Sequence, residues 1–258
     1  MTVTEERFGR VARLTLNAPD KLNPLSLEMI AALHGALDRI AEDRDCHAVV
    51  LAGAGRAFCA GHDLREIQAA RQSEDGGRAA FAELFARCTE MMLRIQSLPQ
   101  PVIAQVHGLA TAAGCQLVAT CDMGLAAEGT RFGVNGVNIG LFCSTPMVAL
   151  TRAVPRKAAF EMLTTGRLIE AEEAQRLGLI NRVVPAEALE AETLQLAETV
   201  AAKLPAAVRY GKRAFHEQVE LPVAEAYALT SEVIVQNLTE PDTAEGIQAF
   251  LEKRPPNW

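Results

Sequence analysis

Residues 102–128 read VIAQVHGLATAAGCQLVATCDMGLAAE, in which a buried strand, a turn and a small-residue helix follow one another. The apolar run from residue 102 predicts the strand, His107 and Gly108 predict the turn, and residues from about 112 to 120 predict the helix. A second apolar run from Met123 completes one α/β unit. Because the helix begins with Ala-Ala-Gly, its first backbone N–H groups have no partner inside the helix and no bulky side chain over them. This helix end is therefore predicted to bind a negatively charged oxygen.

The composition is that of a globular protein that acts on small molecules. The chain has 258 residues, of which 49% are hydrophobic and 22% charged, enough to bury a large core. Its net charge of −7 argues against a nucleic-acid partner or an anionic membrane surface, although a local basic patch could still hold a phosphorylated ligand. We expect neither a nucleic acid nor a membrane among its partners.

The first residues and the cysteines bear on the compartment. No apolar run reaches membrane length, and the N-terminus has neither the order of a secretory signal nor the bias of a transit peptide, which predicts a cytoplasmic protein. The six cysteines (46, 59, 88, 115, 121 and 143) form no C-x-x-C pair. Reduced, buried thiols are therefore expected in place of disulfides, and no metal site is predicted.

Patterning along the rest of the chain alternates between strands and helices. It predicts a strand over residues 9–16, a Ser26-capped helix to about residue 43, a buried strand at 48–51, a mobile polar segment at 65–77 and a helix at 78–97. After the central unit it predicts helices ending near 151, 163 and 177 and a strand at 183–185. From residue 186 the pattern is helical, with breaks at three prolines. Periodicity alone thus predicts an α/β protein with a helical C-terminus.

Two segments resemble the crotonase (enoyl-CoA hydratase/isomerase) superfamily. The central stretch is similar to the signature V-x-G-x-x-x-G-G-G-C-E-L-x-x-x-C-D, and residues 55–64, GRAFCAGHDL, are similar to G-x-x-F-C-A-G-x-D-L/I. The likeness continues over residues 165–181 and 245–254, so it covers nearly the whole chain. It implies an α/β crotonase (ClpP-like) spiral of β-β-α units over residues 1–200. It also implies an all-α oligomerisation region over residues 201–258, assembled as a homotrimer or a dimer of trimers.

The resemblance implies an acyl-CoA thioester substrate, with coenzyme A as part of the substrate and no permanently bound cofactor. In the family, the backbone N–H groups at the positions of Ala60 and Ala113 bind the thioester oxygen and stabilise an enolate. Ala112 and Ala113 replace two residues of the usual triple glycine, which is tolerable if their φ angles are negative. The family's CoA contacts carry over to Lys21, Leu22, Phe58, Ala60, His62, Asp63 and Leu64. The contacts of its C-terminal motif, which the resemblance assigns to a neighbouring subunit, carry over to Phe250 and Lys253.

Both glutamates with which hydratases activate water are absent. The first position holds Gln116, which cannot take a proton at neutral pH, and the second holds Gly136. The leading hypothesis is an acyl-CoA enzyme of enoyl-CoA hydratase/isomerase type, and the competing one is an acyl-CoA-binding protein with weak or no turnover. The sequence is most similar to a subgroup of the superfamily that lacks the same glutamates.

Another crotonase-type reaction, an isomerisation or a thioester hydrolysis, stays open. Asn135, Cys143 and Ser144 are the candidates to carry it. A nucleophilic Cys143 needs a nearby base or a lowered pKa, and the sequence shows neither. A buried packing thiol with Ser144 as a helix N-cap is the preferred reading.

Overall fold

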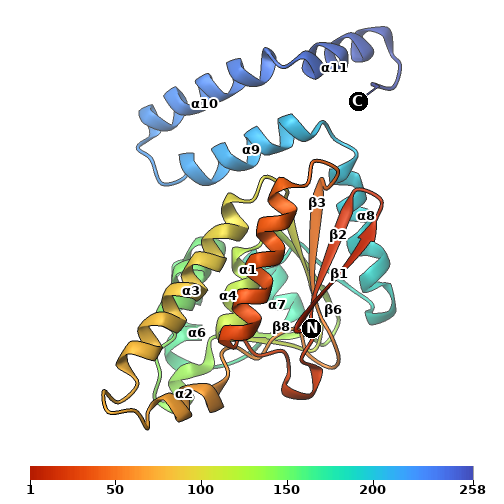
Figure 1. Ribbon diagram of the computed structural model, residues 1–258. Coiled ribbons are helices and arrows are strands. Elements are labelled where there is room, and N and C mark those ends of the chain that lie inside the picture. Colours follow the sequence, from red (N-terminus) through yellow and green to blue (C-terminus); the bar gives the residue numbers. More distant parts are fainter. Residues whose placement is uncertain (258) are drawn as a thin grey trace.

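Six strands form the larger of two sheets in the computed structural model, which describes residues 1–257 (Figure 1). Their order is β1-β2-β3-β4-β6-β9, with β1 and β2 antiparallel and every other pair parallel. The strands are β1 (Val3–Phe8), β2 (Val11–Leu16), β3 (Ala48–Gly53), β4 (Val102–Val106), β6 (Met123–Ala127) and β9 (Arg182–Val184). The smaller sheet consists of β5 (Leu109–Thr111), β7 (Arg131–Gly133) and β8 (Ile169–Glu170).

Helices cover both faces of the larger sheet. On one face, Val49 and Leu51 of β3 share a core with α1 (Leu27–Glu42), α3 (Arg78–Ser97) and α4 (Ala113–Thr120). On the other face, Val50 packs in a second core with apolar residues of α8 (Leu189–Ala201). A strand buried on both faces has a continuous apolar sequence, which explains the run that predicted β3.

The predicted helix boundaries agree well with the structure. Ser26 caps α1, since its Oγ accepts a hydrogen bond from the N–H of Met29 at 3.1 Å. The helix predicted over residues 78–97 is confirmed as α3. The breaks in the helical tail are also confirmed: Pro205 and Pro241 begin helices, and Pro222 is the N-cap of another.

Two predictions of local structure were wrong. The strand predicted from residue 9 begins at Val11, and β1 before it was missed because its middle is polar and exposed. Residues 65–77 were predicted as a polar stretch without regular structure, but α2 (Leu64–Ala70) comes first and a hydrogen-bonded turn follows. In that turn the Asp75 carboxylate accepts hydrogen bonds from the N–H groups of Gly77 and Ala79, which also caps α3.

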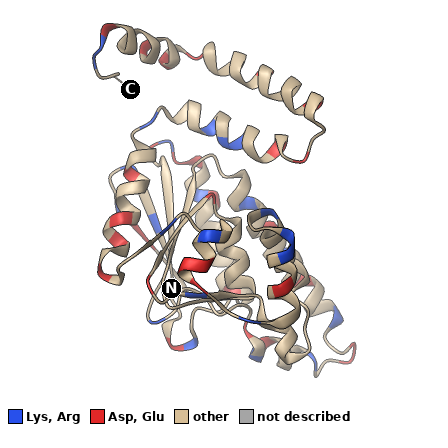
Figure 2. Cartoon of the chain, turned by 180° about the vertical axis from the view of Figure 1, so that it is seen from behind, with Lys and Arg blue, Asp and Glu red and all other residues tan. Residues whose placement is uncertain are grey.

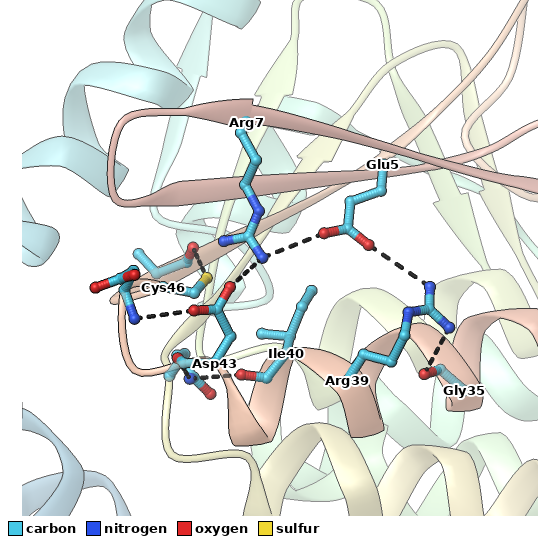
Figure 3. Close-up of polar contacts among 10 residues, drawn as sticks. Glu5, Arg7, Gly35, Arg39, Ile40, Asp43 and Cys46 are labelled. Atoms are coloured by element: carbon cyan, nitrogen blue, oxygen red, sulfur yellow. Dashed lines mark hydrogen bonds and ion pairs between the residues drawn. The ribbon is translucent and has the colours of Figure 1, made fainter.

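Ion pairs connect the outer strand β1 with α1 (Figure 3). The Arg7 guanidinium lies 3.2 Å from the Glu5 carboxylate and also pairs with Asp43, and Arg39 lies 3.6 Å from Glu5. Exposed charges on an edge strand disfavour pairing with another chain, so this edge is protected from extension of the sheet.

The remaining helices surround the smaller sheet or form the tail. They are α5 (Ser144–Ala153), α6 (Arg156–Thr165), α7 (Ala171–Leu177), α9 (Pro205–Gln218), α10 (Val223–Leu238) and α11 (Pro241–Glu252), with 3-10 turns η1 (Pro19–Lys21), η2 (Asn135–Ile139) and η3 (Ala186–Ala188). The α9 helix contacts α3, and α10 lies against α9 on its outer side (Figure 1). Within residues 1–257, no helix is both long and apolar enough to span a bilayer. The division of the chain between residues 200 and 201 stays a prediction.

Candidate active site

A cavity of about 610 Å³ lies where the loop before α2 meets α3, α4, η2 and α5. Most of its lining is apolar, with a small number of neutral polar side chains, a composition typical of small-molecule sites. It is lined by Ala60, His62, Leu64, Ile67, Phe85, Thr111, Ala112, Ala113, Asn135, Gly136, Asn138, Ile139, Leu141, Phe142, Cys143, Ser144, Thr145 and Pro146. Eight of the predicted site residues are thus brought together here.

Asn23 holds the loop that carries Ala60 and His62. This role was not predicted from the sequence. Its side chain is fully buried, its Oδ1 accepts from the N–H of Ala18 at 2.8 Å, and its Nδ2 donates to the carbonyls of Ala54 and Ala57 at 2.8 Å each. A third carbonyl, that of Phe58, lies at 3.2 Å. The available signal was an Asn-Pro dipeptide at a turn, since Asn tolerates the positive φ of 52° observed here.

Two glycines let this loop approach the start of α4. A Cβ added to Gly114 would lie 2.2 Å from the carbonyl oxygen of Cys59, so only glycine fits at that position. Gly61 has a φ of +97°, and a Cβ added there would lie 3.0 Å from the Ala112 Cβ and 3.1 Å from the Thr111 carbonyl oxygen. The two segments predicted to bind an oxygen are therefore in contact.

The backbone N–H of Ala60 is not available to a ligand, which contradicts the role predicted for it. This N–H donates to the carbonyl of Leu22 at 3.0 Å and so closes the loop. In contrast, the N–H groups of His62 and Ala113 donate no hydrogen bond to any residue within 1–257. Both residues line the cavity, so the pair of free donors is His62 and Ala113.

Ala112 also departs from expectation, because its φ is +49° and its ψ is −117°. The alanines were expected to be tolerable at negative φ, but this conformation is one that glycine adopts far more readily. The positive φ at this position explains why the family signature has glycine there. A strained residue directly precedes the free N–H of Ala113.

The two positions that lack glutamate differ in their surroundings. Gln116 lies on α4 with a buried side chain, and its Oε1 has no hydrogen-bond partner in the described chain. Gly136 lines the cavity in η2, where an added Cβ would lie 2.5 Å from the carbonyl oxygen of Leu141 and 2.9 Å from the Cys143 sulfur. Neither position presents a carboxylate to the cavity.

The candidates for other chemistry also lie here. Burial raises the pKa of the Cys143 thiol, which disfavours the thiolate that a nucleophile needs. Cys143 is the N-cap of α5, and not Ser144 as predicted; Ser144 is its first residue and donates to the carbonyl of Phe142 at 3.3 Å. The side chain of Asn138 donates to the carbonyl of Gly166 at 3.3 Å, and Asn135 lies beside it in η2.

The predicted CoA contacts fall into two sets, one near the cavity and one at the C-terminus. Lys21 is exposed and Leu64 lines the cavity, but the Phe58 side chain is fully buried and only its backbone could meet a ligand. Asp63 caps α2 by accepting from the N–H of Arg65 at 2.9 Å, which gives its carboxylate a structural role in the loop.

The C-terminal pair lies elsewhere. Phe250, 83% exposed, belongs to α11, and the exposed Lys253 ends that helix. Figure 1 places α11 at the opposite end of the molecule from α2, which lines the cavity. These two residues therefore cannot reach the cavity of their own chain.

The sequence profile of the enoyl-CoA hydratase/isomerase family matches residues 6–258. The chain belongs to this family. Enoyl-CoA hydratase domain-containing protein 3, mitochondrial, of Mus musculus is 45% identical to this enoyl-CoA hydratase/isomerase family member over 258 residues, which is 100% of this chain and 84% of the relative. A putative enoyl-CoA hydratase of Thermus thermophilus is 39% identical over 97% of this chain and 98% of its own length.

Solved structures of the family share the fold. An enoyl-CoA hydratase of Mycobacterium smegmatis superposes with a TM-score of 0.96 at 51% identity, covering 100% of this family member and 99% of that chain. Human enoyl-CoA hydratase domain-containing protein 3 gives a TM-score of 0.95 at 43% identity, with both chains fully covered. The predicted crotonase fold with a helical C-terminal region is confirmed, and so is the likeness to the enoyl-CoA hydratase domain-containing protein 3 group.

The predicted cytoplasmic location was wrong by the same comparison. Five relatives that are 44–45% identical to this family member, from mouse, rat, frog, human and zebrafish, are named mitochondrial. The prediction rested on the lack of secretory-signal and transit-peptide features in the first residues. Such an absence does not determine the compartment.

Proposed function

We propose that this protein acts on acyl-CoA thioesters and stabilises the enolate form of the thioester with the backbone N–H groups of His62 and Ala113. The observation that carries the proposal is the pair of free donors beside a largely apolar cavity. Backbone donors fixed in advance stabilise charge that develops on an oxygen, and removing one such donor typically costs about 3–4 kcal/mol of transition-state stabilisation. The cavity takes the acyl chain.

Coenzyme A is proposed to leave the cavity past Leu22 and Lys21, with Phe250 and Lys253 of another subunit covering its adenine end. Supporting this, Lys21 is exposed at the end of η1, two residues before Asn23, and Phe250 is exposed on α11, at the opposite end of the molecule from α2. A trimer, or a dimer of trimers, would bring the tail of one subunit to the cavity of the next.

A thermal-shift titration with acetyl-CoA and octanoyl-CoA tests the binding. Because a ligand that binds only the folded state stabilises it by mass action, saturating concentrations of each should raise the melting temperature. Free acetate and octanoate are the controls that show whether the CoA moiety is needed for the rise in melting temperature. If both thioesters leave the melting temperature unchanged, the proposal fails.

The second candidate is an acyl-CoA-binding protein with little turnover, favoured by Gln116 and Gly136. One positioned acid or base contributes typically 10²–10⁴-fold to a rate, so hydration of crotonyl-CoA should be far slower than in an enzyme with both carboxylates. A screen against 2-enoyl-CoA and 3-enoyl-CoA thioesters separates the candidates. Turnover of any of them supports the enzyme, and binding without turnover supports the binding protein.

A further inference from the structure

The lining of the cavity contains two side chains that titrate, His62 and Cys143. Burial raises the pKa of the Cys143 thiol, so this group stays protonated at neutral pH. Burial lowers the pKa of His62, against the opposing effect of its hydrogen bond to Leu25, so the imidazole stays neutral. Of the lining side chains, only His62 can therefore accept a proton near pH 7.

The surroundings of His62 determine which nitrogen is free. Its Nδ1 lies 3.0 Å from the carbonyl oxygen of Leu25. Since a carbonyl oxygen only accepts, Nδ1 must carry the hydrogen in the neutral ring, which leaves the lone pair on Nε2. The geometry of one hydrogen bond thus sets the tautomer that a general base requires.

Within the described residues, the Nε2 atom of His62 takes no part in holding the structure together through a hydrogen bond. Nε2 is buried and has no hydrogen-bond partner within residues 1–257. A buried polar atom without a partner costs about 1–3 kcal/mol and is rare enough to need an explanation. Phe85 holds the ring in place from α3, with the two ring centroids 5.3 Å apart and the planes at 85°.

We propose that His62 Nε2 is the group that removes and returns a substrate proton at this site. The inference rests on the proposed function, because the backbone N–H of the same residue is one of the two donors for the thioester oxygen. One residue would then hold the oxygen through its backbone and handle the proton through its side chain.

The proton transfer balances without a co-reactant. Nε2 takes a proton from C2 of a 3-enoyl-CoA, and the C–H electron pair becomes part of a dienolate whose negative charge rests on the thioester oxygen. The imidazolium then returns the proton to C4, and the double bond moves from C3–C4 to C2–C3. Return to C2 regenerates the substrate. This step needs one group that changes its protonation state, whereas hydration by the usual route needs two.

The test is hydrogen exchange in D₂O, with a 3-hexenoyl-CoA probe, on the full chain and on His62→Asn. The Asn amide can still donate to the Leu25 carbonyl, but it cannot accept a proton. We expect the unaltered protein to place deuterium at C2 and C4 of the probe and to form 2-hexenoyl-CoA. His62→Asn should slow both by at least about 100-fold. Thermal-shift affinity for the probe should change by less than about threefold.

Two further variants complete the design. His34→Asn on α1, far from the cavity lining, is the matched control and should exchange at the unaltered rate. His62→Gln, which also cannot accept a proton, repeats the test in case His62→Asn does not fold. Equal exchange by the unaltered protein and a folded His62 variant overturns the role of His62. Binding of the probe with no exchange in the unaltered protein also overturns it and leaves the binding proposal standing, whereas absence of binding overturns both.

Discussion

At the residue scale, Ala112 is strained where the family signature has glycine. A residue held at such angles costs about 1–3 kcal/mol, whereas adding glycine costs about 0.4–1 kcal/mol through the unfolded chain. Ala112→Gly is therefore expected to raise the unfolding free energy by up to about 2.5 kcal/mol, measured by urea denaturation. Ala31→Gly, on the exposed face of α1, is the control and should lower it by about 0.5–1 kcal/mol. Equal losses for the two variants would show that Ala112 is not strained.

Restoring the two glutamates is expected to have unequal effects. Gln116→Glu with Gly136→Glu would place carboxylates at the two positions where hydratases have them. In the structure, the Cβ of any residue at 136 would lie 2.5 Å from the Leu141 carbonyl, so Gly136→Glu must displace the cavity wall. We expect Gln116→Glu to keep the melting temperature within a few degrees, and the Gly136→Glu variant to unfold at clearly lower temperature in a calorimetric scan. A fully stable Gly136→Glu variant would contradict this geometry.

The sequence located the two segments that are proposed to bind the oxygen, but not which of their N–H groups are free of other hydrogen bonds. The motifs of residues 55–64 and 108–116 located both segments, because small residues at a helix start and in a turn are a local signal. The engagement of the Ala60 N–H depends on Leu22, nearly 40 positions away in the chain. Contacts of that range are not visible in local patterning, and neither is the sign of φ at Ala112.

At the element scale, a buried ion pair joins the tail helix α9 to the core. The Lys212 ammonium donates to the carbonyls of Ile95 and Gln100 at 2.8 and 3.0 Å and to the Asp122 carboxylate at 2.7 Å. Burial lowers the pKa of Lys212, and the charge of Asp122 opposes this effect. His216, one turn further along α9, lies 3.0 Å from the same carboxylate.

Lys212→Met should therefore loosen α9 from α3. Removing one partner of a buried pair costs about 3–5 kcal/mol when the other partner is left without compensation. Asp122 keeps its contacts with the Val102 N–H and with His216, so we expect a loss of stability below this range. The measurement is the unfolding free energy, with hydrogen exchange of α9 amides as a local readout. Arg213→Met, an exposed neighbour on the same helix, is the control and should stay within about 0.5 kcal/mol. A Lys212→Met variant as stable as this control would show that the pair does not anchor the tail.

Elements with strong periodicity or caps were predictable, and weakly patterned ones were not. The apolar stripe and Ser26 located α1, and the prolines located the tail helices. The polar edge strand β1 shows no alternation, and α2 is a short helix without a buried residue. The first is stabilised by pairing with β2 and the second by its Asp63 cap, which apolar periodicity does not report.

At the scale of the whole molecule, the tail helices present an apolar surface. Charged residues are sparse on α10 (Figure 2). Large apolar side chains of α10 and α11 stay exposed: Tyr227, Ile234, Val235, Leu238, Ile247, Phe250 and Leu251. Large exposed apolar side chains in this number on two neighbouring helices are typical of an interface between subunits.

We expect light scattering at micromolar concentration to report a trimer or a dimer of trimers. Burial of the tail surface between subunits would supply the stabilisation. The double variant Ile234→Asp with Leu238→Asp should dissociate the assembly. Glu28→Asp, at an exposed position of α1, should not. A monomer for the unaltered chain would contradict both the assembly and the proposed role of Phe250 and Lys253.

We expect the thioester carbonyl to accept hydrogen bonds from the N–H groups of His62 and Ala113. Infrared difference spectroscopy of hexanoyl-CoA labelled with ¹³C at the thioester carbon reports this bond directly, because hydrogen bonding to a carbonyl lowers its stretching frequency. We predict that the labelled band moves to lower frequency when the thioester binds, beyond its position in water. A band that stays at its position in water, with the thioester bound at saturation, would contradict the account.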